Sequence, residues 1–202
     1  MYPLSVFVAK IPKNTPITTL SHPLRQSQID DCLSYKVKEE KFFVWKLLEY
    51  AVNLVLGEPI SNFNITLDKT GKWLSNGFEF SLSHSKGVVA VAISPNPVGV
   101  DIELIEAPKI NVFRKVLNDK QLKEFNLLPE SQKIEYFITK WANKESVFKS
   151  KNLPSLMADN DHCDCEVFDK KIRFEDLSYI LSVAGVGALS TIVTTVDFNG
   201  IL

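Results

Sequence analysis

The chain has 202 residues, of which 45% are hydrophobic and 23% charged, and its formal net charge is −1 at pH 7. This length can bury a substantial core, and the near-neutral charge gives no case for general binding to nucleic acid. No apolar run reaches the ~18 residues needed to cross a bilayer, the first residues do not form a signal-peptide pattern, and three cysteines fit a reducing compartment better than a disulfide framework. We therefore expect a cytoplasmic protein without a membrane partner.

The first half of the chain predicts a long helix beside several strands. We expect, in chain order, a strand over residues 4–9, a short helix over 29–34, a long helix over 37–56, and strands over 78–82 and 88–94. Pro23 is among the prolines that interrupt the segment before the short helix. Gly57 and Pro59 end the long helix, as a C-terminal glycine and a following proline should. The stretch 68–76 is rich in turn-forming residues and contains Lys72.

The second half predicts a similar set of elements. We expect a strand over 98–104, a short helix over 119–125 capped by Asn118 or Asp119, a long helix over 131–150, and strand-like runs over 165–168, 179–184 and 189–196. This element order favours a mixed α/β fold of the α+β kind. It permits two lobes, residues 1–97 and 98–202, each with a long helix packed on a small antiparallel sheet.

Two carboxylates share one face of the strand predicted over 98–104. Side chains alternate along a strand, so Asp101 and Glu103 point the same way, while Val100, Ile102 and Leu104 take the opposite face. Two carboxylates on one face provide hard oxygen ligands suited to Mg²⁺.

A third carboxylate lies in the long helix predicted over 131–150. Apolar residues recur there at helical spacing and form one stripe: Ile134, Ile138, Trp141 and Phe148. Glu145 falls inside this stripe, with Lys144 and Lys149 near its two edges. A carboxylate facing the core needs a metal, a cation or a catalytic task, because burial of an unpaired charge is costly. A Glu145 paired with one of the two lysines is the simpler interpretation, and a metal site shared with Asp101 and Glu103 is the alternative that we favour.

These residues resemble the 4′-phosphopantetheinyl transferase superfamily, specifically its longer surfactin-synthetase-activating (Sfp) type. The family's G-[IV]-D-[IVL]-E strand matches residues 99–103, and its W-x-x-K-E-[SA]-x-x-K helix matches residues 141–149. A Gly-Lys pair at 71–72 and a Ser-His-Ser segment at 83–85 complete the family order. The resemblance covers roughly residues 30 to 155. It implies a pseudo-twofold arrangement of the two lobes, with the active site at their junction.

The resemblance implies an enzyme that moves the phosphopantetheine arm of coenzyme A onto a serine of an apo carrier protein and releases adenosine 3′,5′-bisphosphate. Asp101 and Glu103 would hold Mg²⁺ or Mn²⁺. Glu145 would complete the metal site, accept the serine proton, or do both. Lys149 would neutralise the pyrophosphate, and Lys144 would contact the same phosphates or remain a solvated lysine.

The resemblance also implies a set of coenzyme A contacts. Ser83, His84 and Ser85 would bind the diphosphate, and Lys72 would reach the nucleotide. Cations for the 3′-phosphate are expected at the start of the first long helix, and the candidates there are Lys36, Lys38 and Lys41. Phenylalanines stand at positions 42 and 43, where the family often has an arginine, so these contacts stay open.

The implied partners are coenzyme A and an apo acyl or peptidyl carrier protein, and we expect a monomer. Residues 113–117 and Lys120 are a candidate surface for the acidic carrier. The alternatives are a non-catalytic coenzyme A-binding relative and a Mg²⁺-dependent coenzyme A diphosphohydrolase. Residues 162–165 (His-Cys-Asp-Cys) lack the spacing of a structural zinc site, and we expect an ordinary polar loop.

Overall fold

A computed structural model describes residues 2–108, 112–151 and 165–201 of the chain. Its main elements, in chain order, are β1 (Ser5–Lys10), α1 (Pro23–Asp30), α2 (Tyr35–Leu56), β2 (Ile65–Leu67), β3 (Trp73–Ser75), β4 (Glu79–Ser85), β5 (Val88–Ser94), β6 (Val98–Leu104), α3 (Phe113–Val116), α4 (Asp119–Leu127), α5 (Glu130–Lys151), β7 (Val167–Phe174), β8 (Leu177–Gly185) and β9 (Ile192–Val196). The mixed α/β character expected from the sequence is confirmed. No helix in the described parts of the chain is long and apolar enough to span a membrane.

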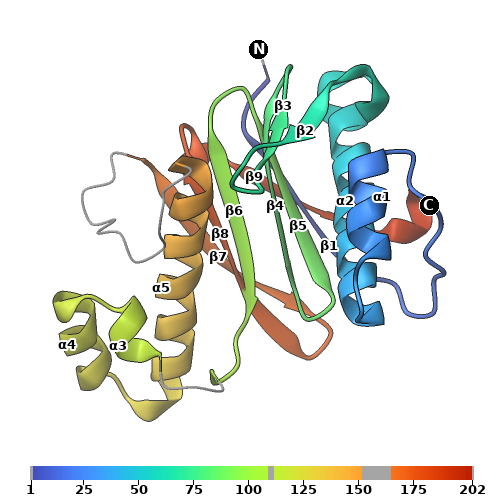
Figure 1. Cartoon of the computed structure of the whole chain (residues 1–202). Helices are drawn as coiled ribbons and strands as arrows, with labels where there is room; N and C mark the ends of the chain where they lie inside the picture. The colour runs from blue at the N-terminus through green and yellow to red at the C-terminus, as the bar shows by residue number, and fades with distance from the viewer. Residues whose placement is uncertain (1, 109–111, 152–164, 202) are drawn as a thin grey trace.

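The strands form two main sheets and one small hairpin. The first sheet has the order β4-β5-β1-β9 and is antiparallel except for the parallel pair β1 and β9. The second has the order β6-β8-β7 and is antiparallel throughout. β2 and β3 form a separate hairpin that adjoins β4. Figure 1 shows the sheets between the two long helices, with α2 on one side and α5 on the other.

The alternation of side chains along the strands separates the hydrophobic cores. One face of the first sheet packs against α2 through residues such as Phe7, Val89, Val91, Phe43 and Leu47. The other face packs against the second sheet through residues such as Val6, Val8, Ala90, Val100, Ile102 and Leu181. A third cluster, which includes Phe125 and Phe137, joins α3, α4 and α5 to Ile180 of β8. The apolar face of β6 is thus buried between the sheets, which leaves its carboxylate face to α5.

Helix α5 lies unusually close to β6, because Gly99 has no side chain. A Cβ atom on Gly99 would lie 1.8 Å from the main-chain oxygen of Ser146 and 2.6 Å from the main-chain nitrogen of Ser150. The buried face of α5 at this contact carries small residues one turn apart, Ala142, Ser146 and Ser150. Glycine opposite small residues therefore brings the end of α5 that carries Lys149 down onto the strand that carries Asp101.

Most of the predicted elements are confirmed, with shifts that have physical causes. The strand over 98–104 has the predicted bounds, and α2 ends at Leu56, where Gly57 takes the left-handed conformation (φ 72°). The helix predicted over 29–34 is wrong: α1 covers 23–30 and begins at Pro23, with His22 as its cap. Proline at the first position of a helix loses no hydrogen bond, so Pro23 starts the helix and does not interrupt it.

The C-terminal strands differ from their predicted bounds. β7 begins at Val167 and extends to Phe174, because charged residues on its exposed face hide the alternation that defines a strand. β9 is shorter than predicted and belongs to the first sheet, beside β1. The predicted boundary at residues 97 and 98 falls between β5 and β6. Because β9 pairs with β1, the second half of the chain also contributes a strand to the first sheet. The pseudo-twofold relation of the lobes stays a prediction.

Candidate active site

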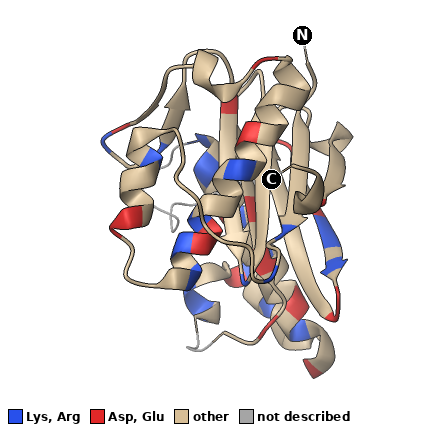
Figure 2. Cartoon of the chain, turned by 90° about the vertical axis from the view of Figure 1, so that its right-hand side faces the viewer, with Lys and Arg blue, Asp and Glu red and all other residues tan. Residues whose placement is uncertain are grey.

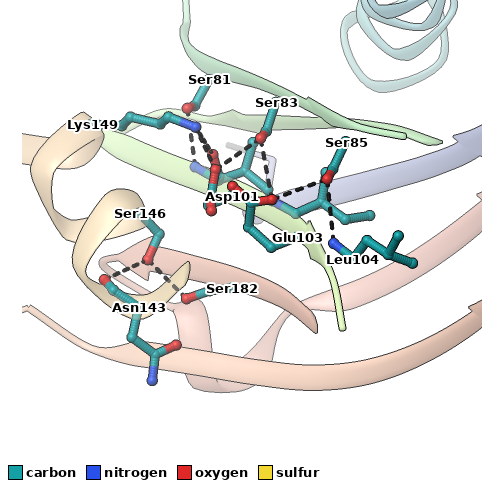
Figure 3. A network of polar contacts seen from close by, with 12 residues as sticks. Ser81, Ser83, Ser85, Asp101, Glu103, Leu104, Asn143, Ser146, Lys149 and Ser182 are labelled. Atoms are coloured by element: carbon teal, nitrogen blue, oxygen red, sulfur yellow. Dashed lines mark hydrogen bonds and ion pairs between the residues drawn. The ribbon is translucent and has the colours of Figure 1, made fainter. Parts of the chain in front are cut away.

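Asp101 is the buried centre of a polar cluster between β4, β6 and α5. Its Oδ1 atom accepts hydrogen bonds from Lys149 Nζ at 2.7 Å and from Ser83 Oγ at 2.9 Å. Its Oδ2 atom is buried and has no hydrogen-bond partner. Lys149 also donates to the main-chain oxygen of Val100 at 3.1 Å, so its ammonium group is fixed at this end of the strand (Figure 3). A buried carboxylate oxygen without a partner indicates a place for a ligand or a metal ion.

Glu103 and Glu145 add negative charge around Asp101. Burial, and then repulsion from Asp101, raise the pKa of Glu103 to about 7, although Ser85, Lys149 and Trp141 pull it down. Burial and Asp101 also raise the pKa of Glu145, and Lys149 opposes this effect. Both glutamates are thus held near the charge of Asp101, and Lys149 is the lysine that lowers the pKa of each. A cation would relieve this excess of negative charge.

The donor set fits a hard divalent cation that completes its shell with other oxygens. In the described parts of the chain, no three side chains of His, Cys, Asp or Glu are close enough to form a ready-made metal site. Mg²⁺ in proteins often takes only one or two carboxylates and fills its other positions with water and substrate phosphates. The unpartnered Oδ2 of Asp101, with Glu103 two residues further along the same face, meets this need.

The Ser-His-Ser segment is divided between two faces of β4. Ser83 donates to Asp101, and Ser85 Oγ donates to Glu103 Oε2 at 3.0 Å. His84 points to the other side, where its Nδ1 atom lies 3.2 Å from Glu40 Oε2 of α2. The two serines therefore contact the carboxylates in this structure, whereas the histidine contacts the first long helix.

Glu40 is a partner of His84 that sequence reasoning missed. Its burial raises its pKa, but hydrogen bonding and attraction from His84, with smaller contributions from Gly87 and Lys36, lower the pKa below its usual value. Glu40 is therefore held charged, and it orients the ring of His84. Its sequence signal is its spacing, because it lies one helical turn before Val44, which is also buried.

A cavity of about 320 Å³ opens beside Glu40. Its walls come from the ends of β1 and β7, the start of α2 and the β4–β5 turn. The lining carries four lysines, namely Lys10, Lys13, Lys36 and Lys86. Figure 2 shows that basic and acidic residues are interspersed on the face formed by α1 and α2. Two glutamates also line the cavity, and the remaining excess of positive charge suits a ligand with several phosphate groups.

The three lysines predicted for the 3′-phosphate are separated. Lys36 lines the cavity. Lys38 and Lys41 instead donate to main-chain oxygens of α1, those of Asp30 at 3.4 Å and Gln28 at 3.1 Å. Lys10 and Lys86, which sequence reasoning missed, line the same cavity as Lys36. The β4–β5 turn residue Lys86 has a positive φ of 47°, and its ion pair with Glu106 (3.2 Å) is half-exposed.

A second cavity, of about 270 Å³, also has Lys86 in its lining. Its lining includes Glu103 and Ser85 from the polar cluster. Most of its other walls are apolar side chains, such as Leu104, Pro108, Val112, Phe137, Ile138 and Trp141. The two cavities therefore share Lys86, with one of them basic and the other largely apolar.

The remaining predicted residues lie apart from the Asp101 cluster. Lys72 is in the turn between β2 and β3, where its main-chain nitrogen donates to Asp68 Oδ1 at 3.0 Å. Lys144 is half-buried on α5. In the proposed carrier surface, Arg114, Lys115 and Lys120 are exposed, but Val116 and Leu117 are buried in the core and do not form an apolar patch. Most of the His-Cys-Asp-Cys loop lies outside the described residues.

Comparison with known proteins gives one consistent result. A model of the 4′-phosphopantetheinyl transferase superfamily matches residues 97–181, the stretch that holds Asp101, Glu103, Glu145 and Lys149. The 4′-phosphopantetheinyl transferase psf-1 of Bacillus pumilus is 31% identical over 106 residues, 51% of this chain and 46% of that protein. The 4′-phosphopantetheinyl transferase gsp of Aneurinibacillus migulanus is 29% identical over 97 residues, 48% of this chain and 41% of that protein. The chain thus spans less than half the length of these relatives.

Proposed function

Because the chain belongs to the 4′-phosphopantetheinyl transferase superfamily, of the Sfp type, we propose that it transfers the phosphopantetheine arm of coenzyme A to a serine of an apo carrier protein. The serine hydroxyl attacks the β-phosphorus of coenzyme A. A new bond forms between the serine oxygen and this phosphorus, and the bond to the bridging oxygen of the diphosphate breaks. Adenosine 3′,5′-bisphosphate leaves with that oxygen, and the serine proton passes to a base.

The observation that carries this proposal is the buried Oδ2 atom of Asp101, which lacks a partner beside two glutamates of raised pKa. Asp101 and Glu103 would hold Mg²⁺ or Mn²⁺, whose bound form would polarise the phosphoryl oxygens and offset their charge. Glu145 accepts the serine proton, directly or through water, because a carboxylate of raised pKa is a better base near neutral pH. Lys149 keeps a fixed positive charge beside the reacting phosphates.

The two cavities match the two chemically different ends of coenzyme A. The basic cavity takes the phosphorylated nucleotide, and the apolar cavity takes the uncharged arm. Lys86 lines both and so lies beside the diphosphate that joins the two ends. Half-exposed ion pairs such as Lys86–Glu106 contribute little stability, so the lysine is available to a phosphate. His84, oriented by Glu40, and Lys72 are further candidates for nucleotide contacts.

Intact-mass spectrometry of a panel of apo acyl and peptidyl carrier proteins, incubated with this protein, coenzyme A and Mg²⁺, tests the proposal. We expect one carrier or more to gain a single phosphopantetheine, and Asp101→Asn and Glu145→Gln to abolish the gain. Glu135→Gln is the matched control, because Glu135 lies on the same helix α5 and forms only a half-exposed ion pair with Lys171. This control should transfer the arm at the wild-type rate.

Two other outcomes would overturn the proposal. Binding of coenzyme A without modification of any carrier would indicate a non-catalytic member of the superfamily. Loss of coenzyme A in the absence of a carrier, with release of adenosine 3′,5′-bisphosphate and phosphopantetheine, would indicate that water is the nucleophile and that the protein is a diphosphohydrolase.

A further inference from the structure

Three serines on one face of β4 contact the edge of β6 at regular intervals. Ser81, Ser83 and Ser85 alternate along β4, and their Oγ atoms accept hydrogen bonds from the main-chain nitrogens of Val100, Ile102 and Leu104 at 3.0, 3.2 and 3.3 Å. β6 is the edge strand of the second sheet, and the serine hydroxyls occupy the place of main-chain acceptors on a neighbouring strand (Figure 3). The serine row thus joins the two sheets.

Two members of the row have a second role that the third lacks. Ser83 also donates to Asp101 Oδ1, and Ser85 also donates to Glu103 Oε2. Each of these hydroxyls therefore accepts from the main chain of β6 and donates to a carboxylate of β6. A hydroxyl has one proton to donate, so the orientation of each is fixed by this pair of contacts.

The geometry fixes one oxygen of Asp101 and leaves the other free. Oδ1 is held by Ser83 and Lys149, and Oδ2 is buried without a partner. If Ser83 were absent, the carboxylate could rotate about its terminal bond, because this kind of torsion has a broad energy profile. Groups that orient a metal ligand from behind often change metal affinity by 10- to 100-fold.

We propose that Ser83 and Ser85 are positioning residues, which hold the carboxylates of Asp101 and Glu103 in the orientation that binds a divalent cation. This inference rests on the proposed function and differs from the expectation that these hydroxyls contact coenzyme A. Of residues 83–85, it assigns the two serines to binding of the metal ion and only His84 to contact with the nucleotide. The two serines act through the carboxylates and do not touch the reacting atoms.

Ser81 provides a matched control within the same strand. Ser81→Ala removes the same kind of bond to β6 as Ser83→Ala and Ser85→Ala, but no bond to a carboxylate. Isothermal titration calorimetry with Mn²⁺, in the presence and absence of coenzyme A, measures the affinity for the cation directly. We expect Ser83→Ala and Ser85→Ala to weaken Mn²⁺ binding about tenfold or more, and Ser81→Ala to leave it within about twofold of wild type. Urea unfolding should show a loss of stability for all three variants, larger for Ser83→Ala and Ser85→Ala because they also lose a bond to a carboxylate.

A conservative variant keeps the test decisive if an alanine variant folds poorly. Ser83→Thr retains the hydroxyl and should bind Mn²⁺ like wild type. Equal Mn²⁺ affinity in all three alanine variants would overturn the inference, as would a wild-type protein that binds no Mn²⁺. Loss of coenzyme A binding in EDTA in Ser83→Ala, with Mn²⁺ binding intact, would place the hydroxyl on the nucleotide and also overturn it. A protein that modifies no carrier, yet shows the expected Mn²⁺ pattern, would refute the transferase and support the positioning role.

Discussion

Substitution of Gly99 by alanine should test the contact that brings α5 onto β6. The φ of Gly99 lies outside the left-handed region, so its backbone accepts any residue. In such a position, alanine usually stabilises a protein by about 0.4–1 kcal/mol, because it restricts the unfolded chain. Any loss of stability must therefore come from the helix above it.

The expected loss can be worked out from the position of the missing Cβ atom. At 1.8 Å from the Ser146 oxygen, the new atom would be about 1.6 Å short of the 3.4 Å at which ordinary contact begins. The clashing atoms belong to the main chain, so no rotation of a side chain relieves the contact. Overpacking of this kind typically costs about 1–3 kcal/mol, and we expect the upper end of this range, since the helix itself must move. Steric repulsion thus outweighs the entropic gain.

The same displacement should uncouple Lys149 from Asp101. A shift of α5 by about 1.6 Å would stretch the 2.7 Å contact of Lys149 Nζ with Asp101 Oδ1 beyond hydrogen-bonding distance. A misplacement of about 1 Å at a reacting centre can cost about a hundredfold in rate. We therefore expect Gly99→Ala to lose transfer activity by about two orders of magnitude or more, in addition to its loss of stability.

Urea unfolding and the rate of carrier modification measure the two effects. Gly200→Ala is the matched control, because a Cβ atom at Gly200 meets nothing within 4 Å and its φ also lies outside the left-handed region. It should unfold and react like the wild-type protein. If Gly99→Ala were as stable as the wild type or more stable, with an unchanged rate of carrier modification, the close contact between α5 and β6 would not exist as described.

Three further predictions concern the cavity, the acid response and a helix cap. Lys86→Gln should raise the KM for coenzyme A roughly tenfold, because a charged hydrogen bond to phosphate is lost, with little change in urea unfolding; a KM within twofold of wild type would place the diphosphate elsewhere. Burial raises the pKa of Glu40, but the opposing effect of His84 brings the pKa below its value in the unfolded chain. The stability that Glu40 contributes is therefore present above about pH 4.3 and is lost as pH falls through the lowered pKa of Glu40. In a plot of the urea unfolding midpoint against pH, Glu40→Gln should therefore make the decrease at acid pH less steep. An unchanged decrease would contradict the ion pair between Glu40 and His84. Asn118→Ala should cost about 1 kcal/mol in thermal or urea unfolding, because Asn118 caps α4 in a capping box, whereas an unaltered midpoint would show that the cap is dispensable.

The sequence predicted the carboxylate strand well because its alternation has one simple cause. Val100 and Ile102 are buried between the sheets, so Asp101 and Glu103 must face the other way. The buried face of α5 was harder to predict, because it is built from small and partly polar residues. A search for large apolar side chains selected Trp141 and Phe148, which are only half-buried, and passed over Ser146 and Ser150, which are buried.

The separation of His84 from its neighbouring serines also follows from a pattern that was present in the sequence. Ser81, Ser83 and Ser85 alternate with Leu82 and His84, so a strand must place them on opposite faces. The strand predicted over 78–82 ended before Ser83, whereas β4 continues to Ser85, and this difference hid the alternation. The lysines of the cavity could not be selected in this way, because they come from elements far apart in the chain that only the tertiary fold brings together.

The position of the cluster explains why its parts depend on one another. β4 belongs to the first sheet and provides the serine donors, whereas β6 belongs to the second sheet and provides the carboxylates. α5 covers the second sheet and adds Lys149. Asp101 and its two donors, Ser83 and Lys149, thus come from three different elements, so a change in how these elements meet alters the orientation of Asp101. Variants at Ser83, at Ser85 and at Gly99 should therefore affect the same property, cation binding, through two different neighbours of β6, namely β4 and α5.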